Sequence, residues 1–198
     1  MTNEHDHQHV HHHHEHRPIG YAEAITQFRA EKDEWFKESH DSPIPEAERA
    51  AFTGLPYFPV DPALRFEGLA LEPYRGDEPS NFEIPTSDGK LRPAHRAGIL
   101  PFELGGARLA LTAYTFDGGE DEALFVPFLD PGSGTDTYGA GRYLDIEPED
   151  DGTYTLDFNL AYHPSCVYDN RSSCPLTPRE KRLPVRILAG ERLASTEG

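Results

Sequence analysis

The order of hydrophobic and polar residues changes its period once along the chain. Near the N-terminus, five large hydrophobic residues recur at helical spacing among charged ones: Tyr21, Ile25, Phe28, Trp35 and Phe36. This spacing predicts an amphipathic helix over Tyr21–Glu38. Pro43 and Pro45 end that helix because proline removes a backbone donor and disfavours the helical conformation before it. Pro45 also suits the first position of a short second helix, which Gly54 would end.

From Leu64 onward, short extended runs alternate with turn residues, as is typical of antiparallel strands. The runs cover residues 64–71, 81–85, 94–102, 108–116, 123–128, 142–146, 154–159 and 183–188. Glycines mark the turns between them because glycine adopts positive φ without steric cost. The pattern predicts an α+β fold that is mainly β. We expect an antiparallel barrel or a two-sheet sandwich, with the one N-terminal amphipathic helix packed across it.

Length and charge narrow the classes of function. The 198 residues correspond to about one domain, which we expect over residues 18–198, behind a disordered His-rich tail of residues 1–17. The chain has 35 acidic and 18 basic residues and a formal charge of −17, which argues against a nucleic-acid partner. No stretch is long and apolar enough for a membrane span or a signal peptide. We therefore expect a cytoplasmic protein without a membrane partner.

The basic residues are themselves biased, with 14 Arg and 4 Lys. An acidic excess with few Lys is typical of a protein kept soluble at high salt, where repulsion between carboxylates is screened. A GC-rich genome would produce the same bias, so both interpretations stand. Salt adaptation predicts that the melting temperature rises steeply between low and molar salt.

The N-terminal tail is the first candidate site. It contains eight of the 11 histidines: His5, His7, His9, His11, His12, His13, His14 and His16. Neutral imidazole is a common transition-metal ligand, so we expect the tail to bind ions such as Zn, Ni or Cu. Other residues interrupt the histidines, which favours a native segment over a purification tag. Metal buffering or delivery and a passive low-complexity tail both remain open.

Two cysteines and a nearby histidine form the second candidate site. His163, Cys166 and Cys174 supply three soft ligands, one fewer than a structural zinc site takes and as many as a catalytic zinc site takes. The thiols could instead pack as small hydrophobic groups or form a disulfide. A reducing cytosol disfavours a stable disulfide. Structural thiols, a disulfide, and a metal or catalytic site therefore stay as alternatives.

A set of polar residues near the last strands forms the third candidate site. Its members are Arg142, Asp145, Asp157, Asn159, Tyr162, Tyr168, Asn170 and Glu180. Alternation along a strand places Asp157 and Asn159 on one face and Phe158 on the other. If the polar face lines a cleft, the set could bind a small ligand together with Cys166 and Cys174. The alternative, which we favour, is that these side chains hydrogen-bond the irregular loop over residues 162–184.

One further feature of this region is a short glycine run. Gly139, Ala140 and Gly141 precede Arg142, and such a run could hold an anion in a nest of backbone N–H groups.

Two blocks of sequence carry a family resemblance. They comprise Phe128-Leu129-Asp130, Ser133-Gly134 and the run from Thr137 to Asp145, then Leu156-Asp157-Phe158-Asn159, Ala161-Tyr162, Pro164, Cys166, Tyr168, Ser173-Cys174-Pro175, Pro178, Glu180, Arg182-Leu183-Pro184-Val185 and Ala189-Gly190-Glu191. With these motifs the chain resembles the prokaryotic domain-of-unknown-function family 1684, from the helix around Trp35 to Glu191. The resemblance implies no reaction, since the family has none assigned. It also implies Asn where this chain has His163 and Lys181.

Three classes of function follow. We favour non-catalytic binding of a small molecule by the β domain, which predicts an apolar-lined pocket without converging titratable groups. The alternative is an enzyme that uses Arg142, Asp157, His163 and Cys166, and it predicts His163 within hydrogen-bond reach of Cys166 or a carboxylate. A metal-handling protein, the third class, would keep almost all of its metal affinity before Pro18.

Overall fold

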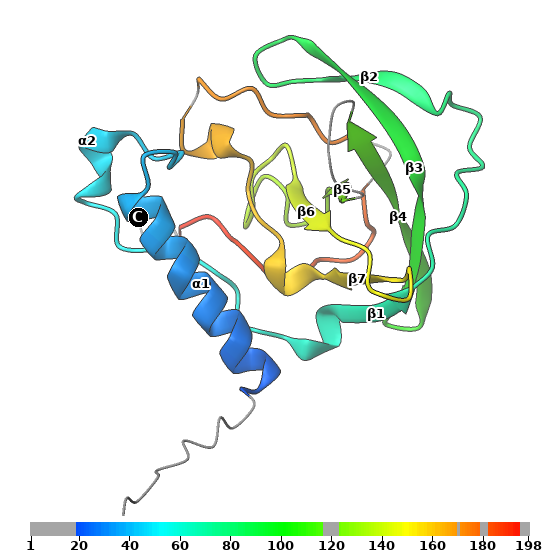
Figure 1. Ribbon diagram of the computed structural model, residues 1–198, viewed down its shortest axis with the longest axis horizontal. Helices are drawn as coiled ribbons and strands as arrows, with labels where there is room; N and C mark the ends of the chain where they lie inside the picture. Colours follow the sequence, from blue (N-terminus) through cyan, green and yellow to red (C-terminus); the bar gives the residue numbers. More distant parts are fainter. Residues whose placement is uncertain (1–18, 117–122, 170, 179–181, 195–198) are drawn as a thin grey trace, which may run out of the picture.

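Over the residues that the structure describes, the fold combines two α-helices with seven antiparallel strands (Figure 1). The structure is a computed structural model that describes residues 19–116, 123–169, 171–178 and 182–194. Its regular elements are α1 (Tyr21–Glu38), α2 (Glu46–Arg49), β1 (Arg65–Leu69), β2 (Asn81–Pro85), β3 (Leu91–Leu104), β4 (Ala107–Phe116), β5 (Leu124–Phe128), β6 (Arg142–Ile146) and β7 (Tyr154–Asp157). The predicted His-rich tail lies outside the described residues.

The strands form two antiparallel sheets. One sheet has the order β2-β3-β4-β5-β6, and the other pairs β1 with β7. Within the described ranges, β2 and β6 are the edges of the larger sheet and do not close it into a barrel. The mainly β, α+β prediction is therefore confirmed. The second sheet is a two-stranded ribbon.

The hydrophobic core lies between the larger sheet and the β1–β7 ribbon. Its fully buried members come from both, with Leu100 and Leu111 on β3 and β4 and Leu156 on β7. Phe158 lies at the centre, because its ring contacts Phe66, Phe102 and Phe128. Alternation along β3 buries every second residue from Ala94 to Phe102, as a strand with one face on a core requires.

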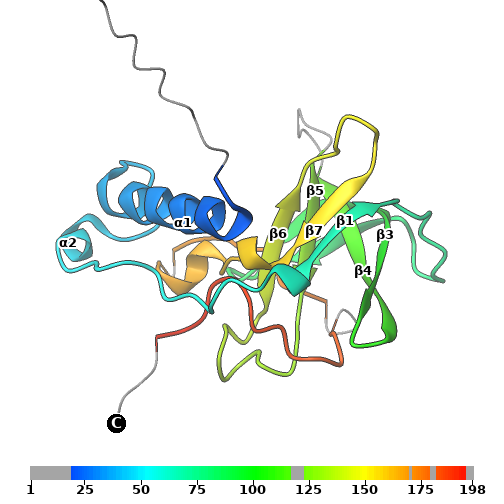
Figure 2. The same ribbon diagram turned by 90° about the horizontal axis from the view of Figure 1, so that it is seen from below.

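Helix α1 has the predicted bounds and packs beside the sheets. Figure 2 shows both helices at one end of the molecule, with β3 and β4 at the other. Ile25 and Phe36 are buried, whereas Phe28 and Trp35 are about half exposed on another side of the helix. Only two of the five hydrophobic residues are therefore buried, and the buried face of α1 is narrower than the sequence predicted.

The prediction of a strand over residues 183–188 is wrong. This segment runs without regular pairing, and the neighbouring isolated bridge joins Leu129 to Arg182. At Ile187 the backbone groups bind side chains: Arg142 donates to the Ile187 carbonyl, and the Asp130 carboxylate accepts the Ile187 N–H. Pro184 also lacks the N–H that a ladder needs.

Other predicted elements differ at their ends. The expected strand 154–159 stops at Asp157, where the Asp157 carboxylate accepts the Asn159 N–H and caps a short 3₁₀ helix, Phe158–Leu160. β1 is shorter than the expected 64–71, and β3 is longer than the expected 94–102. Gly89 and Gly152 have the predicted positive φ in their turns, and the turn expected at residues 117–119 lies outside the described ranges.

Candidate functional site

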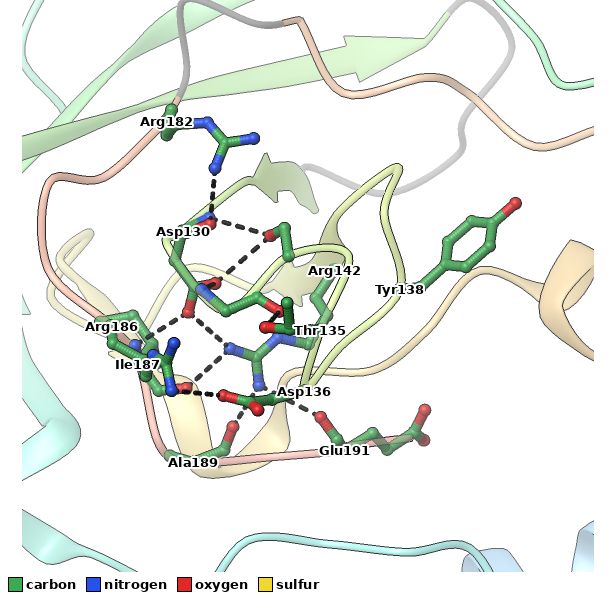
Figure 3. Close-up of polar contacts among 12 residues, drawn as sticks. Asp130, Thr135, Asp136, Tyr138, Arg142, Arg182, Arg186, Ile187, Ala189 and Glu191 are labelled. Atoms are coloured by element: carbon green, nitrogen blue, oxygen red, sulfur yellow. Dashed lines mark hydrogen bonds and ion pairs between the residues drawn. The ribbon is translucent and has the colours of Figure 1, made fainter. Parts of the chain in front are cut away.

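A fully buried ion pair lies at the edge strand β6 of the larger sheet (Figure 3). Asp130 follows β5 and Arg142 begins β6, so the pairing of these strands brings the two residues together. Arg142 Nη2 lies 3.2 Å from Asp130 Oδ2, and each side chain is 1% exposed. Burial lowers the pKa of Arg142 to about 10 while Asp130 opposes the shift. Arg142 therefore stays charged at neutral pH.

Backbone groups of the C-terminal segment surround this ion pair. Arg142 donates to the carbonyls of Ile187 at 2.8 Å and Glu191 at 3.2 Å, and also to that of Ala189. Asp130 accepts the N–H groups of Ile187 and Gly132, each at 2.8 Å. Because protein groups occupy both side chains, the pair fastens the C-terminal segment to β6 and is not free to hold a ligand.

Glu191 is the centre of a second buried cluster, between the C-terminal segment and α1. It is 1% exposed, and its Oε1 lies 2.7 Å from Lys32 Nζ. Its Oε2 accepts the backbone N–H of His163 at 2.7 Å and the Tyr168 hydroxyl at 3.1 Å. Burial raises the pKa of Tyr168, and the Glu191 charge adds to this shift. The cluster therefore connects α1 and the segment after β7 to the C-terminal segment at Glu191.

The imidazole of His163 is held by one hydrogen bond and lies near Glu191. Nε2 accepts the backbone N–H of Tyr138 at 3.3 Å, which places the ring proton on Nδ1. Nδ1 lies 3.7 Å from Glu191 Oε2, beyond hydrogen-bond distance. Burial lowers the pKa of His163 to about 3, and the cations of Arg142 and Lys32 add to the shift. His163 is thus a neutral structural residue at physiological pH.

Asp157 and Asn159 form a third cluster, which holds the first turn of α1. The Tyr21 hydroxyl lies 2.9 and 2.8 Å from the two Asp157 oxygens, and Asn159 Nδ2 donates to the same hydroxyl at 2.9 Å. Asn159 also exchanges two hydrogen bonds with the backbone of Asp61. These contacts reach α1 and residue 61. Neither side chain was expected to bond there, since the sequence suggested the loop over residues 162–184.

A cavity of about 450 Å³ lies beside the glycine run that precedes Arg142. Its described lining residues are Leu129, Gly139, Ala140, Leu176, Thr177 and Arg182, and this space is called the Thr177 cavity below. Thr177 is 7% exposed, and its hydroxyl has no hydrogen-bond partner among the described residues. The Arg182 guanidinium donates one hydrogen bond to the Asp130 carbonyl, at 2.8 Å. A volume of this size is typical of small-molecule sites.

The structure separates the predicted ligand residues into groups. Arg142 belongs to the ion pair, Tyr168 to the Glu191 cluster, and Asp157 with Asn159 to the α1 anchor. Asp145 is exposed and accepts the Tyr162 hydroxyl at 2.5 Å. Cys166 and Cys174 lie beside each other. Asn170 and Glu180 lie outside the described residues, as do the tail histidines.

Sequence reasoning missed the residues that organise these groups: Lys32, Asp130, Thr177, Arg182 and Glu191. Asp130, Arg182 and Glu191 lie within the motifs that carried the family resemblance, which was the signal available for them. Thr177 and Lys32 had no local signal, because their importance depends on neighbours far away in the sequence.

In the described ranges, no three His, Cys, Asp or Glu side chains are grouped to hold a metal ion, so His163, Cys166 and Cys174 do not form a ligand set there. No helix of the described chain is long and apolar enough to cross a membrane.

The chain matches one protein family and is similar to solved structures. The family described as "Protein of unknown function (DUF1684)" matches residues 50–192. A similar solved structure is the solution NMR structure of the uncharacterized protein from gene locus rrnAC0354 of Haloarcula marismortui, with 39% identity and a TM-score of 0.64. This match covers 86% of the present chain and 92% of that chain. No curated protein matches significantly.

Proposed function

Since the chain belongs to the DUF1684 family, whose function is unknown, we propose a function from the chemistry of its own cavity: the protein binds a small molecule with an anionic group in the Thr177 cavity. Binding of a small ligand by the β domain is what the sequence favoured. The site now suggested for it lies on Thr177 and Arg182, not on the polar set around Asp157.

The observation that carries this proposal is the Thr177 hydroxyl. A buried hydroxyl without a partner costs about 1–3 kcal/mol, so a protein gains by giving it one. Thr177 lines the cavity, and its hydroxyl is buried beside Gly141 and has no partner among the described residues. A ligand oxygen that enters the cavity as far as Gly141 would accept its hydrogen bond.

An anionic group fits the remaining polar atoms of the cavity. Arg182 lines it and has no further partner than the Asp130 carbonyl within the described ranges. The backbone N–H groups of Gly139 and Ala140 have no acceptor among the described residues either. Guanidinium and successive backbone N–H groups together favour a carboxylate or phosphate. Leu129 and Leu176 offer apolar surface to the rest of the ligand.

The enzyme alternative has less support. It requires His163 to reach Cys166 or a carboxylate as a base, yet Nε2 holds the Tyr138 N–H and Nδ1 lies 3.7 Å from Glu191. The Thr177 cavity also lacks converging acid and base groups among its described lining residues.

The test compares two threonine-to-valine variants. Each removes one buried hydroxyl, one in the wall of the cavity and one outside it. We expect phosphate or acetate, added at constant ionic strength, to raise the melting temperature of the wild type. Thr177→Val should weaken that binding about tenfold, because one hydrogen bond to a charged group is lost. Thr137→Val is the matched control: the Thr137 hydroxyl is equally buried and lacks a described partner, but Thr137 is not among the described residues that line the cavity.

Stability separates binding from folding in the same experiment. Without ligand, both valine variants should have a free energy of unfolding about 1 kcal/mol higher than the wild type. Each loses a buried hydroxyl that has no described partner. Arg182→Gln should also weaken binding. Equal anion affinity in the wild type and Thr177→Val, or no binding by the wild type, would refute the proposal.

A further inference from the structure

The two cysteines of the chain lie next to each other. Cys166 is in the short 3₁₀ helix Ser165–Val167, and Cys174 lies in the segment that follows. The backbone N–H of Cys166 donates to Cys174 Sγ at 3.3 Å. Both are free thiols; Cys174 is buried and Cys166 is partly exposed. Cys166 is therefore the more exposed residue of the pair, and Cys174 is held beside it.

The environments of the two thiols differ. Burial raises the pKa of the Cys174 thiol to about 11. The Cys166 N–H opposes this shift, and a side-chain hydrogen bond with the Cys166 thiol adds to it. Cys174 is therefore protonated at neutral pH, and the accessible Cys166 is the thiol that a soluble oxidant meets first.

Both cysteines are joined to the walls of the Thr177 cavity. Cys166 Sγ lies 3.8 Å from the hydroxyl of Tyr138, the residue before Gly139 in the cavity wall. Cys174 precedes Leu176 and Thr177, which form another part of the wall. Cys174 is itself fixed to the turn after β2, where its N–H donates to the Ser87 hydroxyl at 3.0 Å. Tyr138 and the segment from Cys174 to Thr177 therefore connect the two cysteines to the cavity wall.

We propose that Cys166 and Cys174 are a redox-active dithiol, which a peroxide converts into an intramolecular disulfide that reshapes the Thr177 cavity. The Cys166 thiolate attacks the peroxide, forming an S–O bond and breaking the O–O bond, and the released hydroxide takes up a proton as water. The Cys174 sulfur then attacks Cys166, and its proton leaves with the displaced oxygen as a second water. Two thiols are oxidised and one hydrogen peroxide is reduced to two waters.

The effect on the cavity follows from disulfide geometry and rests on the proposed function. A disulfide requires the two sulfurs to lie about 2.05 Å apart. Reaching that distance changes the contact of Cys166 with Tyr138 and moves the segment that carries Thr177. The reduced form has the cavity described above, so it is the form that we expect to bind anions.

Intact mass and peptide mapping of the full chain test the dithiol. Hydrogen peroxide should lower the mass of the wild type by about 2 Da, the two hydrogens lost in disulfide formation. Peptide mapping should join Cys166 to Cys174, and dithiothreitol should reverse the change. Cys166→Ser and Cys174→Ser should each abolish it, and serine in place of Cys174 can still accept the Cys166 N–H. Oxygen adducts on Cys166, an intermolecular disulfide, or unreacted thiols in the wild type would overturn the dithiol.

Phosphate titration of the reduced and oxidised wild type tests the link to the cavity. The oxidised form should bind inorganic phosphate at least about fivefold more weakly, whereas peroxide should leave the phosphate affinity of Cys174→Ser unchanged. Equal affinity in the two redox forms overturns the link. If neither form binds phosphate or acetate, the proposed function fails, and the mass measurement still decides the dithiol independently.

Discussion

The Arg142 guanidinium and the Asp130 carboxylate lie 3.2 Å apart, and each side chain is 1% exposed. Removing one charge of such a pair leaves the other buried without compensation, which costs about 3–5 kcal/mol. Asp130→Asn should therefore lower the free energy of unfolding by about 3 kcal/mol or more, as measured by urea denaturation at pH 7. Asp136→Asn is the control, because its pair with Arg186 is 34% and 49% exposed and should contribute less than about 1 kcal/mol. Equal losses in the two variants would show that burial does not set the strength of the Asp130 pair.

The first turn of α1 depends on one hydroxyl. Tyr21 donates to the Asp157 carboxylate, and burial followed by the Asp157 hydrogen bond raises the pKa of Tyr21. Tyr21→Phe should lower the free energy of unfolding by about 2 kcal/mol, because the bond is to a charged group. Tyr154→Phe removes a hydroxyl that has no partner in the described part of the chain and should cost less than about 0.5 kcal/mol. Thermal denaturation followed by circular dichroism compares the two, and similar losses would contradict the anchoring role.

Much of the fold was predictable because it depends on local pattern. The Tyr21–Glu38 helix follows from its spacing of hydrophobic residues, and the alternation along β3 marks a strand with one face on the core. The family resemblance is also confirmed. The segment over residues 183–188 has the composition of a strand, but the side chains of Asp130 and Arg142 take its backbone groups. Those contacts span more than 40 residues, so no local pattern could reveal them.

The candidate site was less predictable for the same reason. The sequence identified Asp157, Asn159 and Tyr168 as polar residues that must find partners, and each one does. It did not identify those partners, since Tyr21 lies on a helix more than 100 residues earlier and Glu191, which binds Tyr168, lies 23 residues later. Thr177 matters because its hydroxyl lacks a described partner, and only a three-dimensional arrangement can show that.

The excess of acidic residues predicts a dependence of stability on salt. With a formal charge of −17, the folded chain repels itself at low ionic strength. At 1 M salt the Debye length falls to about 3 Å, which screens this repulsion. If the composition reflects salt adaptation, the melting temperature should rise steeply from low to molar NaCl. An unchanged melting temperature would instead favour the genomic explanation for the bias toward Arg.

The His-rich tail predicts where metal binds. The eight histidines from His5 to His16 should provide almost all of the affinity for Zn or Ni. Elemental analysis of protein purified without a metal column should find bound metal in the full chain and none in a variant that begins at Pro18. Metal retained by the shortened protein would place a site in the β domain and bring Cys166 and Cys174 back as ligands. Unchanged metal tolerance of the host without the tail would favour a passive segment.

The buried neutral imidazole of His163 predicts a loss of stability in acid. Its pKa is lowered to about 3 in the folded protein, against about 6.5 for an ordinary histidine. As the pH falls below 6.5, the unfolded chain gains a proton that the folded protein does not accept until about pH 3. The free energy of unfolding therefore decreases over this range, by about 2 kcal/mol between pH 7 and pH 5.

His163→Asn tests this origin of the pH dependence. The Asn side-chain oxygen can still accept the Tyr138 N–H but does not titrate, so the difference in stability between pH 7 and pH 5 should shrink by about 2 kcal/mol. His40→Asn, at a fully exposed position, should leave the difference unchanged. Urea denaturation of the three proteins at both pH values measures it, and all other titrating groups cancel in the comparison. A slope in His163→Asn equal to that of the wild type would contradict the lowered pKa of His163 in the folded protein.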